Sequence, residues 1–323
     1  MHRRTAGPLT SPGSQGPALA VPERLREWHR GWFGDAGLAW VDALPALAAG
    51  LLEHWSLALD GPTTHGAVAW ILPVRRADGT PAVLKLQPID DETAGEPAAL
   101  RAWAGAGAVR LVEHDPPSGS MLLERLDAER SLLGVADDLA ALQVIAELLA
   151  RLSRTPAPSG LRRLDDVAAR LLERVPAAVR RAPDELAEPL TRCAAVVREV
   201  SSEPAGDRLL HWDLHFGNVL APLPGAAREP WLAIDPKPLA GDPGFELLPA
   251  LHNRWDDVVA TGDVERAVRR RFDLLTDVAG LDRDRARAWT VARVLENLLW
   301  VAETEAAIWS AEPDRAVLRA LLG

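Results

Sequence analysis

The sequence is poor in several residue types, and their scarcity limits what the protein can be. A single cysteine, Cys193, in 323 residues excludes an intramolecular disulfide and a cysteine-based zinc site. Because Cys193 lies in an apolar stretch, we expect a buried structural thiol. Tyrosine is absent, and the 36 basic residues include only two lysines, Lys85 and Lys237. Such an excess of arginine is typical of a GC-rich genome, so the two lysines are more informative than any one arginine.

The sequence also lacks long apolar runs and basic patches. No stretch approaches the roughly 18 apolar residues of a membrane helix. The formal net charge is −10, with no basic stripe, which argues against binding to nucleic acid or an anionic membrane and suits a cationic small-molecule substrate. Residues 1–22 lack the apolar segment of a signal peptide, and their glycine, proline and serine content predicts a disordered tail. We therefore expect a cytoplasmic protein.

The order of apolar runs and turns predicts a β-rich region followed by a helical one. Short apolar runs separated by turns are typical of antiparallel strands. After a helix that begins at residue 23, we expect strands over residues 55–59, 67–74, 82–86, 109–112 and 120–126, with a helix over 90–104 among them. Helical spacing of apolar residues then predicts helices over residues 137–153, 164–175, 183–200 and from 244 onward. A hairpin of residues 218–220 and 231–234 is embedded between these helices.

One polar segment carries most of the chemical information. Residues 211–218 fit the pattern H-x-D-x-x-x-x-N, with Asp213 and Asn218 five residues apart, and Asp235 follows an apolar strand seventeen residues later. Phosphoryl transfer needs a carboxylate that orients the attacking hydroxyl and oxygen ligands that hold Mg²⁺ on the phosphates. An amide oxygen with a carboxylate suits this hard cation, which keeps most of its waters. We therefore expect the three side chains to face one point.

A lysine in an apolar strand is the second chemical signal. Lys85 lies within Val83-Leu-Lys-Leu86, where a charge is costly unless it has a partner. A strand lysine that reaches ATP phosphates and a helix glutamate has such a partner, and Glu96, or alternatively Glu92, is the candidate. Residues 63–67 are the candidate loop over the phosphates, with Gly66 as its glycine.

These segments resemble the aminoglycoside phosphotransferase family of the protein-kinase-like fold, and more narrowly its streptomycin kinase and hydroxyurea-resistance branch. The resemblance covers about residues 25–310. It rests on the motif of residues 211–218 and on Ile234-Asp-Pro-Lys237. Further segments typical of the branch are Gly107-Ala-Val-Arg-Leu111, Met121-Leu-Leu-Glu-Arg-Leu126, Gly241-Asp-Pro-Gly244 and Leu251-His-Asn-Arg254.

The resemblance implies an α+β, two-lobed protein-kinase-like fold. A small antiparallel β-sheet N-lobe, residues 23–126, would bind the nucleotide, and a mainly α-helical C-lobe, residues 127–323, would hold the catalytic and substrate-binding residues. It also implies an ATP- and Mg²⁺-dependent phosphotransferase acting on a hydroxyl of a small molecule, above all an aminoglycoside such as streptomycin. Antibiotic resistance by O-phosphorylation would be the consequence.

The resemblance also assigns roles to residues. Asp213 would be the catalytic base, with Asn218 and Asp235 as Mg²⁺ ligands. Lys85 would grip the α- and β-phosphates and pair with Glu96, while Gly66 would lie in the phosphate loop. The backbone from Glu124 to Leu126 would bind adenine. His215 stands where a protein kinase has lysine, and Pro236-Lys237 where it has Phe-Gly, which is typical of small-molecule kinases and argues against a protein substrate.

Several residues keep more than one interpretation. His211 is either a functional residue or a core histidine that bonds loop carbonyls, and His215 is more typical of a loop-shaping residue. A transition-metal hydrolase built on His-x-Asp-x-His would leave Asn218, Asp235 and Lys85 unexplained.

The acceptor site is the least determined part of the sequence. Asp242, before Pro243, is either a helix N-cap or a substrate contact. Glu246 and Asp256 are candidates to face a cationic acceptor, with a solvated helix face as the alternative. Rival functions are a kinase of another small metabolite, such as a sugar or an amino alcohol, and a non-catalytic nucleotide-binding protein of the same fold.

Overall fold

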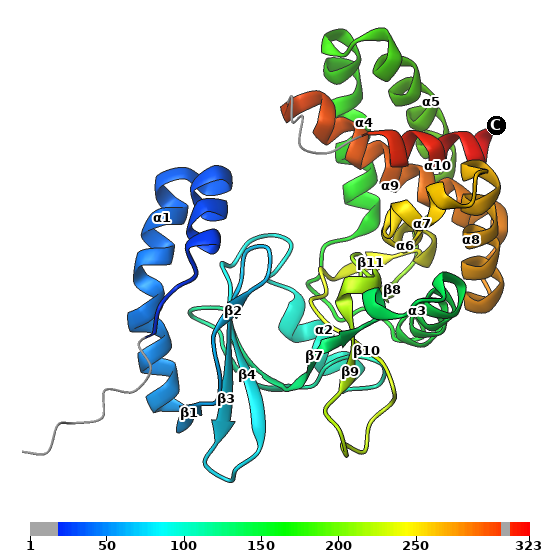
Figure 1. Cartoon of the computed structure of the whole chain (residues 1–323). Coiled ribbons are helices and arrows are strands. Elements are labelled where there is room, and N and C mark those ends of the chain that lie inside the picture. Colours follow the sequence, from blue (N-terminus) through cyan, green and yellow to red (C-terminus); the bar gives the residue numbers. More distant parts are fainter. Residues whose placement is uncertain (1–18, 305–310) are drawn as a thin grey trace, which may run out of the picture. The chain divides into compact units, whose positions relative to one another are not determined.

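The helices and strands that the apolar pattern predicts occur in the expected order, and the structure adds short strands over residues 64–65, 126–131, 208–210 and 239–241. The computed structural model describes residues 19–304 and 311–323, so most of the predicted disordered tail, residues 1–18, lies outside the described residues. The chain divides into two compact units, Met1–Leu86 and Gln87–Gly323 (Figure 1). The predicted boundary between an N-lobe and a C-lobe at residue 126 differs from this division, and it stays a prediction.

The first unit combines one long helix with a small antiparallel sheet. Its elements are α1 (Glu23–His54), β1 (Leu57–Leu59), β2 (Thr64–His65), β3 (Trp70–Arg76) and β4 (Pro81–Leu86). β3 pairs antiparallel with β1, β2 and β4. Alternate side chains of β3, at Trp70, Leu72 and Val74, are buried, as expected for a strand with one face on a core.

Helix α1 is interrupted at Gly34, whose φ of 57° is left-handed. Among the described residues, α1 is the helix whose length and composition would also allow it to cross a membrane. It nevertheless contributes to the core of the first unit, where Leu25, Val41 and Leu44 are fully buried. The buried His29 forms a hydrogen bond of 2.9 Å with the Val68 carbonyl. These contacts are those of a helix packed within a folded unit.

The second unit contains most of the helices. In chain order its helices are α2 (Glu96–Trp103), α3 (Asp138–Leu152), α4 (Leu164–Arg181), α5 (Asp184–Val200), α6 (Leu247–His252), α7 (Trp255–Ala260), α8 (Val264–Ala279), α9 (Arg283–Thr304) and α10 (Glu312–Leu322). Its 3₁₀ turns are η1 (Leu132–Gly134), η2 (Phe216–Asn218) and η3 (Pro243–Glu246). Helix α9 lies beside α4, α5 and α10 (Figure 1) and also packs against η3. Its Trp289, Leu295 and Leu299 are fully buried.

Short strands of the second unit carry the polar loops. They are β5 (Leu111–Asp115), β6 (Ser120–Glu124), β7 (Leu126–Ser131), β8 (Arg208–Leu210), β9 (Val219–Pro222), β10 (Leu232–Ala233) and β11 (Leu239–Gly241). β9 pairs antiparallel with β10 and with β7, while β8 pairs with β11. The predicted hairpin is therefore confirmed. This pairing brings the loop after β8 next to the segment between β10 and β11.

Candidate active site

The loop after β8 is shaped by its own side chains. The Asn218 side chain donates a hydrogen bond of 2.9 Å from Nδ2 to the carbonyl of Asp213. The Nδ1 of His215 accepts a hydrogen bond of 3.0 Å from the amide of Gly217 and caps η2. The loop-shaping interpretation of His215 is thus confirmed. Burial lowers the pKa of His215, which keeps the ring neutral and able to accept this bond.

The hairpin places Asp235 beside Asn218. Val219 pairs with Ala233 across β9 and β10, and the amide of Ile234 donates a hydrogen bond of 2.9 Å to the carbonyl of Asn218. Asp235 follows directly, with a left-handed φ of 59°. A non-glycine residue in this region is strained and is often found at a functional site.

His211 joins the loop to the segment that carries Asp235. Its Nε2 bonds the carbonyl of Ile234 at 3.0 Å, and its own carbonyl accepts a hydrogen bond of 3.0 Å from the amide of Lys237. Burial lowers the pKa of His211 to about 4, so the ring is neutral at physiological pH and donates from Nε2. The interpretation of His211 as a core histidine that bonds loop carbonyls is confirmed.

Glu246 holds the same loop from inside the unit. Its side chain is 1% exposed, and its Oε1 accepts hydrogen bonds from the amides of His211 and of Trp212, the latter at 2.8 Å. Burial raises the pKa of Glu246 to about 7, and the nearby Asp242 acts in the same direction, although the two amide donors favour the charged form. Glu246 was a candidate to face a cationic acceptor, with a solvated helix face as the alternative. The structure agrees with neither, because the carboxylate is enclosed and accepts from backbone amides.

Trp212 is the residue that Glu246 fixes in an unusual conformation. Its φ of 63° is left-handed. The residue is 3% exposed, and two guanidinium groups approach its ring, that of Arg162 at 4.4 Å and that of Arg293 at 5.1 Å from the ring centre. The bulky side chain therefore occupies the interior of the second unit.

The carboxylate of Asp213 lies near the ammonium of Lys237, a residue to which the sequence assigned no role. The Nζ of Lys237 lies 3.7 Å from Oδ2 of Asp213 and 3.2 Å from Oε2 of Glu92. Burial would lower the pKa of Lys237, but the carboxylates of Asp213 and Glu92 outweigh it and the pKa is raised. The scarcity of lysine in the sequence was the signal that pointed to Lys237, since no motif assigns this residue a role.

Asn218 and Asp235 carry the types of donor that Mg²⁺ prefers, on neighbouring stretches of backbone. Because Nδ2 of Asn218 is engaged with the Asp213 carbonyl, Oδ1 is the amide atom left to face a cation. One amide oxygen and one carboxylate, supplemented by waters and phosphate oxygens, are a usual set for Mg²⁺. Among the described residues, no group of three or more His, Cys, Asp or Glu side chains gathers as a denser metal site would require.

The predicted nucleotide-binding residues are divided between the two units. In the first unit, Lys85 is on β4 and is 4% exposed, whereas Gly66 belongs to the turn of the β2–β3 hairpin, where its amide bonds the Ala69 carbonyl at 2.9 Å. In the second unit, Glu96 is buried at the start of α2 and accepts a hydrogen bond of 2.6 Å from Gln87. The roles of these residues stay predictions.

The predicted adenine-binding backbone lies at the end of β6 and the start of β7. The Glu124 side chain accepts a hydrogen bond of 2.7 Å from the amide of Arg110 and forms an ion pair with Arg228. Leu126 is buried, at 8% exposure. Glu124 thus braces the neighbouring backbone with its side chain, and adenine binding at 124–126 stays a prediction.

The two remaining acceptor candidates differ in their surroundings. Asp242 caps η3 by accepting a hydrogen bond of 2.8 Å from the amide of Gly244, and its other oxygen is 2.6 Å from Arg285. The N-cap interpretation of Asp242 is confirmed. A β-carbon at Gly244 would lie 2.6 Å from the Cα of Ala286, so glycine permits the close approach of η3 to α9. Asp256 is exposed in the first turn of α7.

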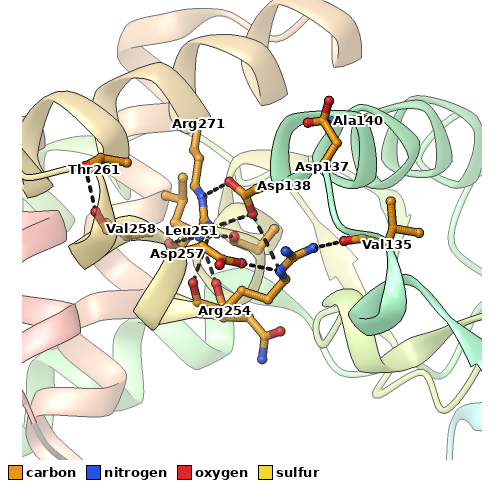
Figure 2. A network of polar contacts seen from close by, with 12 residues as sticks. Val135, Asp137, Asp138, Ala140, Leu251, Arg254, Asp257, Val258, Thr261 and Arg271 are labelled. Carbon is orange, nitrogen blue, oxygen red and sulfur yellow. Dashed lines mark hydrogen bonds and ion pairs between the residues drawn. The ribbon is translucent and has the colours of Figure 1, made fainter.

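A buried arginine network, which the sequence does not reveal, fixes the corner between α6 and α7. Figure 2 shows Arg271 and Arg254 converging on Asp138. Arg271, 2% exposed, makes contacts of 2.7 and 3.1 Å with the two oxygens of Asp138 and donates to the carbonyls of Leu251 and Asn253. Arg254, with a left-handed φ of 53°, donates to the Val135 carbonyl. This network holds the segment Leu251-His-Asn-Arg254 in one conformation.

Comparison with known proteins identifies the relatives of this chain. A family model described as aminoglycoside/hydroxyurea antibiotic resistance kinase matches residues 54–305. A streptomycin 6-kinase of Streptomyces glaucescens is 55% identical over 286 residues, which cover 88% of this chain and 92% of the relative. A hydroxyurea phosphotransferase of Kitasatospora aureofaciens is 54% identical over 311 residues, which cover 95% of this chain and 87% of the relative.

Solved structures show the fold. A choline/ethanolamine kinase family protein of Mesorhizobium loti superposes with a TM-score of 0.55 at 14% identity, covering 81% of this chain and 88% of that one. An ethanolamine kinase of Plasmodium vivax gives a TM-score of 0.53 at 11% identity, covering 96% of each chain. The predicted protein-kinase-like α+β fold is confirmed.

Proposed function

Because the chain belongs to the aminoglycoside/hydroxyurea antibiotic resistance kinase family, we propose that it transfers the γ-phosphoryl group of ATP to a hydroxyl of streptomycin. The observation that carries the proposal is Asp213 on a loop fixed beside Asn218 and Asp235, in a chain 55% identical to a streptomycin 6-kinase. The relative supports the 6-hydroxyl as the acceptor. Streptomycin carries guanidinium groups, and the net charge of −10 suits such a cation.

In the proposed reaction, Asp213 is the general base. Its carboxylate orients the acceptor hydroxyl and takes its proton while the hydroxyl oxygen bonds to the γ-phosphorus. The bond from that phosphorus to the bridging oxygen breaks, and ADP leaves with the electron pair. Little covalent work falls to the protein in such a step, so positioning and charge stabilisation supply most of the rate.

The remaining site residues have supporting roles in the proposal. Asn218 and Asp235 would hold Mg²⁺, which neutralises phosphate charge when bound. Lys85, paired with Glu96, would hold the α- and β-phosphates under the segment that contains Gly66, and the backbone at 124–126 would bind adenine. Of Asp242, Glu246 and Asp256, we retain Asp256 as the proposed contact of the acceptor. We place the reaction in the cytoplasm, where ATP is available.

A second acceptor has a specific observation in its favour. The hydroxyurea phosphotransferase aligns with 95% of this chain at nearly the same identity as the streptomycin kinase. Hydroxyurea also offers a hydroxyl, and a small one, to the same base. Transfer to hydroxyurea is therefore the alternative function that the same assay must include.

The test is product formation by the purified full-length chain with Mg-ATP and either acceptor. We expect ADP release that depends on streptomycin, and a streptomycin product heavier by one phosphate group. In Asp213→Asn we expect kcat to fall by about 10²- to 10⁴-fold, the range for loss of a general base. The matched control is Asp207→Asn, which changes an exposed aspartate and should leave kcat unchanged.

Two results would overturn this proposal. Phosphorylated hydroxyurea without phosphorylated streptomycin would transfer the function to the alternative acceptor. Turnover by Asp213→Asn at the wild-type rate, with unchanged circular dichroism, would remove Asp213 as the base.

A further inference from the structure

Lys237 is fixed between the loop that carries Asp213 and the segment that carries Asp235. It follows Asp235 by two residues, and its amide donates a hydrogen bond of 3.0 Å to the carbonyl of His211. This bond ties the backbone of Lys237 to the loop that begins at His211. The side chain therefore starts from a fixed point close to Asp213.

The ammonium of Lys237 touches two carboxylates at once. Its Nζ is 3.2 Å from Oε2 of Glu92 and 3.7 Å from Oδ2 of Asp213. Glu92 belongs to a turn that Asp90 stabilises, because Oδ1 of Asp90 accepts hydrogen bonds of 2.9 Å from the amides of Glu92 and Thr93. Glu92 is thus in a position to hold Lys237, and Lys237 to hold Asp213.

Among the described residues, the neighbouring basic groups have other contacts. His215 uses its Nδ1 to accept from the amide of Gly217, and burial keeps its ring neutral. The guanidinium groups of Arg162 and Arg293 stack on Trp212. An ammonium is a compact point charge on a flexible stem, whereas the wider, planar guanidinium favours bidentate pairing. This difference gives a reason for a lysine at 237 in a chain with 34 arginines.

We propose that Lys237 is a positioning residue for the transfer step: held by Glu92, its ammonium keeps the carboxylate of Asp213 aimed at the acceptor hydroxyl. The inference rests on the function proposed above, because it assigns Lys237 a task in that reaction. The ammonium acts through Asp213 and takes no proton from the acceptor. Misplacement of a reacting group by about 1 Å can lower a rate by about 100-fold, so a residue that fixes the base has a large effect on kcat.

The first test separates kcat from KM. In Lys237→Met we expect kcat to fall by about 10- to 100-fold, with the KM values for ATP and for streptomycin within about twofold of wild type. In Glu92→Gln we expect a smaller fall in kcat, and no further fall when this change is added to Lys237→Met, because Glu92 acts through Lys237. A purely structural role would lower thermal stability and would not spare both KM values.

The second test restores the charge chemically. In Lys237→Cys, alkylation with 2-bromoethylamine rebuilds an ammonium at nearly the length of lysine, whereas iodoacetamide adds a neutral amide of similar size. The chain's own Cys193 is fully buried with its pKa raised to about 12, so the native protein should be alkylated at position 237 alone. We expect aminoethylation to recover at least about a tenth of the wild-type kcat, and carbamidomethylation to recover none.

The experiments distinguish a failure of this inference from a failure of the proposed function. Failure of the proposed function is seen in the wild type, which would then leave streptomycin unphosphorylated. In that case the variants are compared with the wild type on ATP hydrolysis, in which water would take the place of the acceptor hydroxyl before Asp213. The inference is overturned if Lys237→Met keeps kcat within twofold of wild type, or if both alkylated forms recover activity equally.

Discussion

The buried carboxyl of Glu246 should make stability depend on pH in a defined direction. Its pKa is raised from 4.5 to about 7 in the folded protein, mainly because burial disfavours the charged form. A group whose folded pKa lies above its unfolded pKa binds more protons in the folded state at intermediate pH. Its contribution to stability is therefore complete below the unfolded pKa and is lost as the pH rises through the folded value.

The size of the effect follows from that shift in pKa. At about 1.4 kcal/mol per pKa unit, the shift corresponds to about 3 kcal/mol, of which about 2–3 kcal/mol is lost between about pH 5 and about pH 8. This loss is a large share of the roughly 5–15 kcal/mol that stabilises a typical protein. Because the side chain is 1% exposed, solvent screening does not reduce it much.

The assay compares urea unfolding of the wild type and of Glu246→Gln, which keeps an oxygen to accept from the two amides but cannot titrate. We expect the wild type to lose about 2–3 kcal/mol relative to the variant between about pH 5 and about pH 8. The control is Glu185→Gln, whose side chain is 77% exposed and should give no such trend. A flat or rising difference for Glu246→Gln would show that the two amide hydrogen bonds outweigh burial, and would refute the reasoning.

Two further predictions concern buried side chains away from Asp213. Arg271→Met should lower the free energy of unfolding by about 2–4 kcal/mol, because it removes the hydrogen bonds to Asp138 and to the carbonyls of Leu251 and Asn253 and leaves Asp138 only the longer contact with Arg254. Urea unfolding measures this, and a loss no larger than that of Arg269→Met, an exposed position on the same helix, would contradict it. Cys193, fully buried with its pKa raised to about 12, should not react with Ellman's reagent in the native chain but should react once unfolded. Rapid reaction of the native thiol would contradict the second prediction.

Local pattern was sufficient to predict most elements. The helix expected over residues 137–153 is observed as Asp138–Leu152, and the hairpin of 218–220 and 231–234 is observed as β9 and β10. These elements have apolar residues at a regular spacing, which depends on neighbours within the same segment. The helices expected from residue 244 onward begin with a 3₁₀ turn, and the corner between α6 and α7 at Arg254 has a left-handed φ that no apolar pattern indicates.

The candidate site was predictable as a set of residues but not as a set of contacts. The spacing of Asp213, Asn218 and Asp235 led to the expectation of one shared location, which the β9–β10 pairing supports. The orientation of Glu246 depends on how η3 packs under the loop, and the contact of Lys237 with Asp213 depends on a β-pairing between distant segments. Such contacts follow from tertiary packing, which the residue types near each position do not encode.

The same packing explains how two strained residues persist beside the proposed catalytic groups. Trp212 precedes Asp213 and has a left-handed φ, as does Asp235, and this conformation costs an ordinary residue about 1–2 kcal/mol. For Trp212, the hydrogen bond from its backbone amide to the Glu246 carboxylate offsets this cost. The segment around Asp235 is held by the hydrogen bonds from the His211 ring to the Ile234 carbonyl and from the Lys237 amide to the His211 carbonyl. Relaxation of either residue would disturb these bonds, so the bonds that stabilise the unit also hold the backbone from which both carboxylates project.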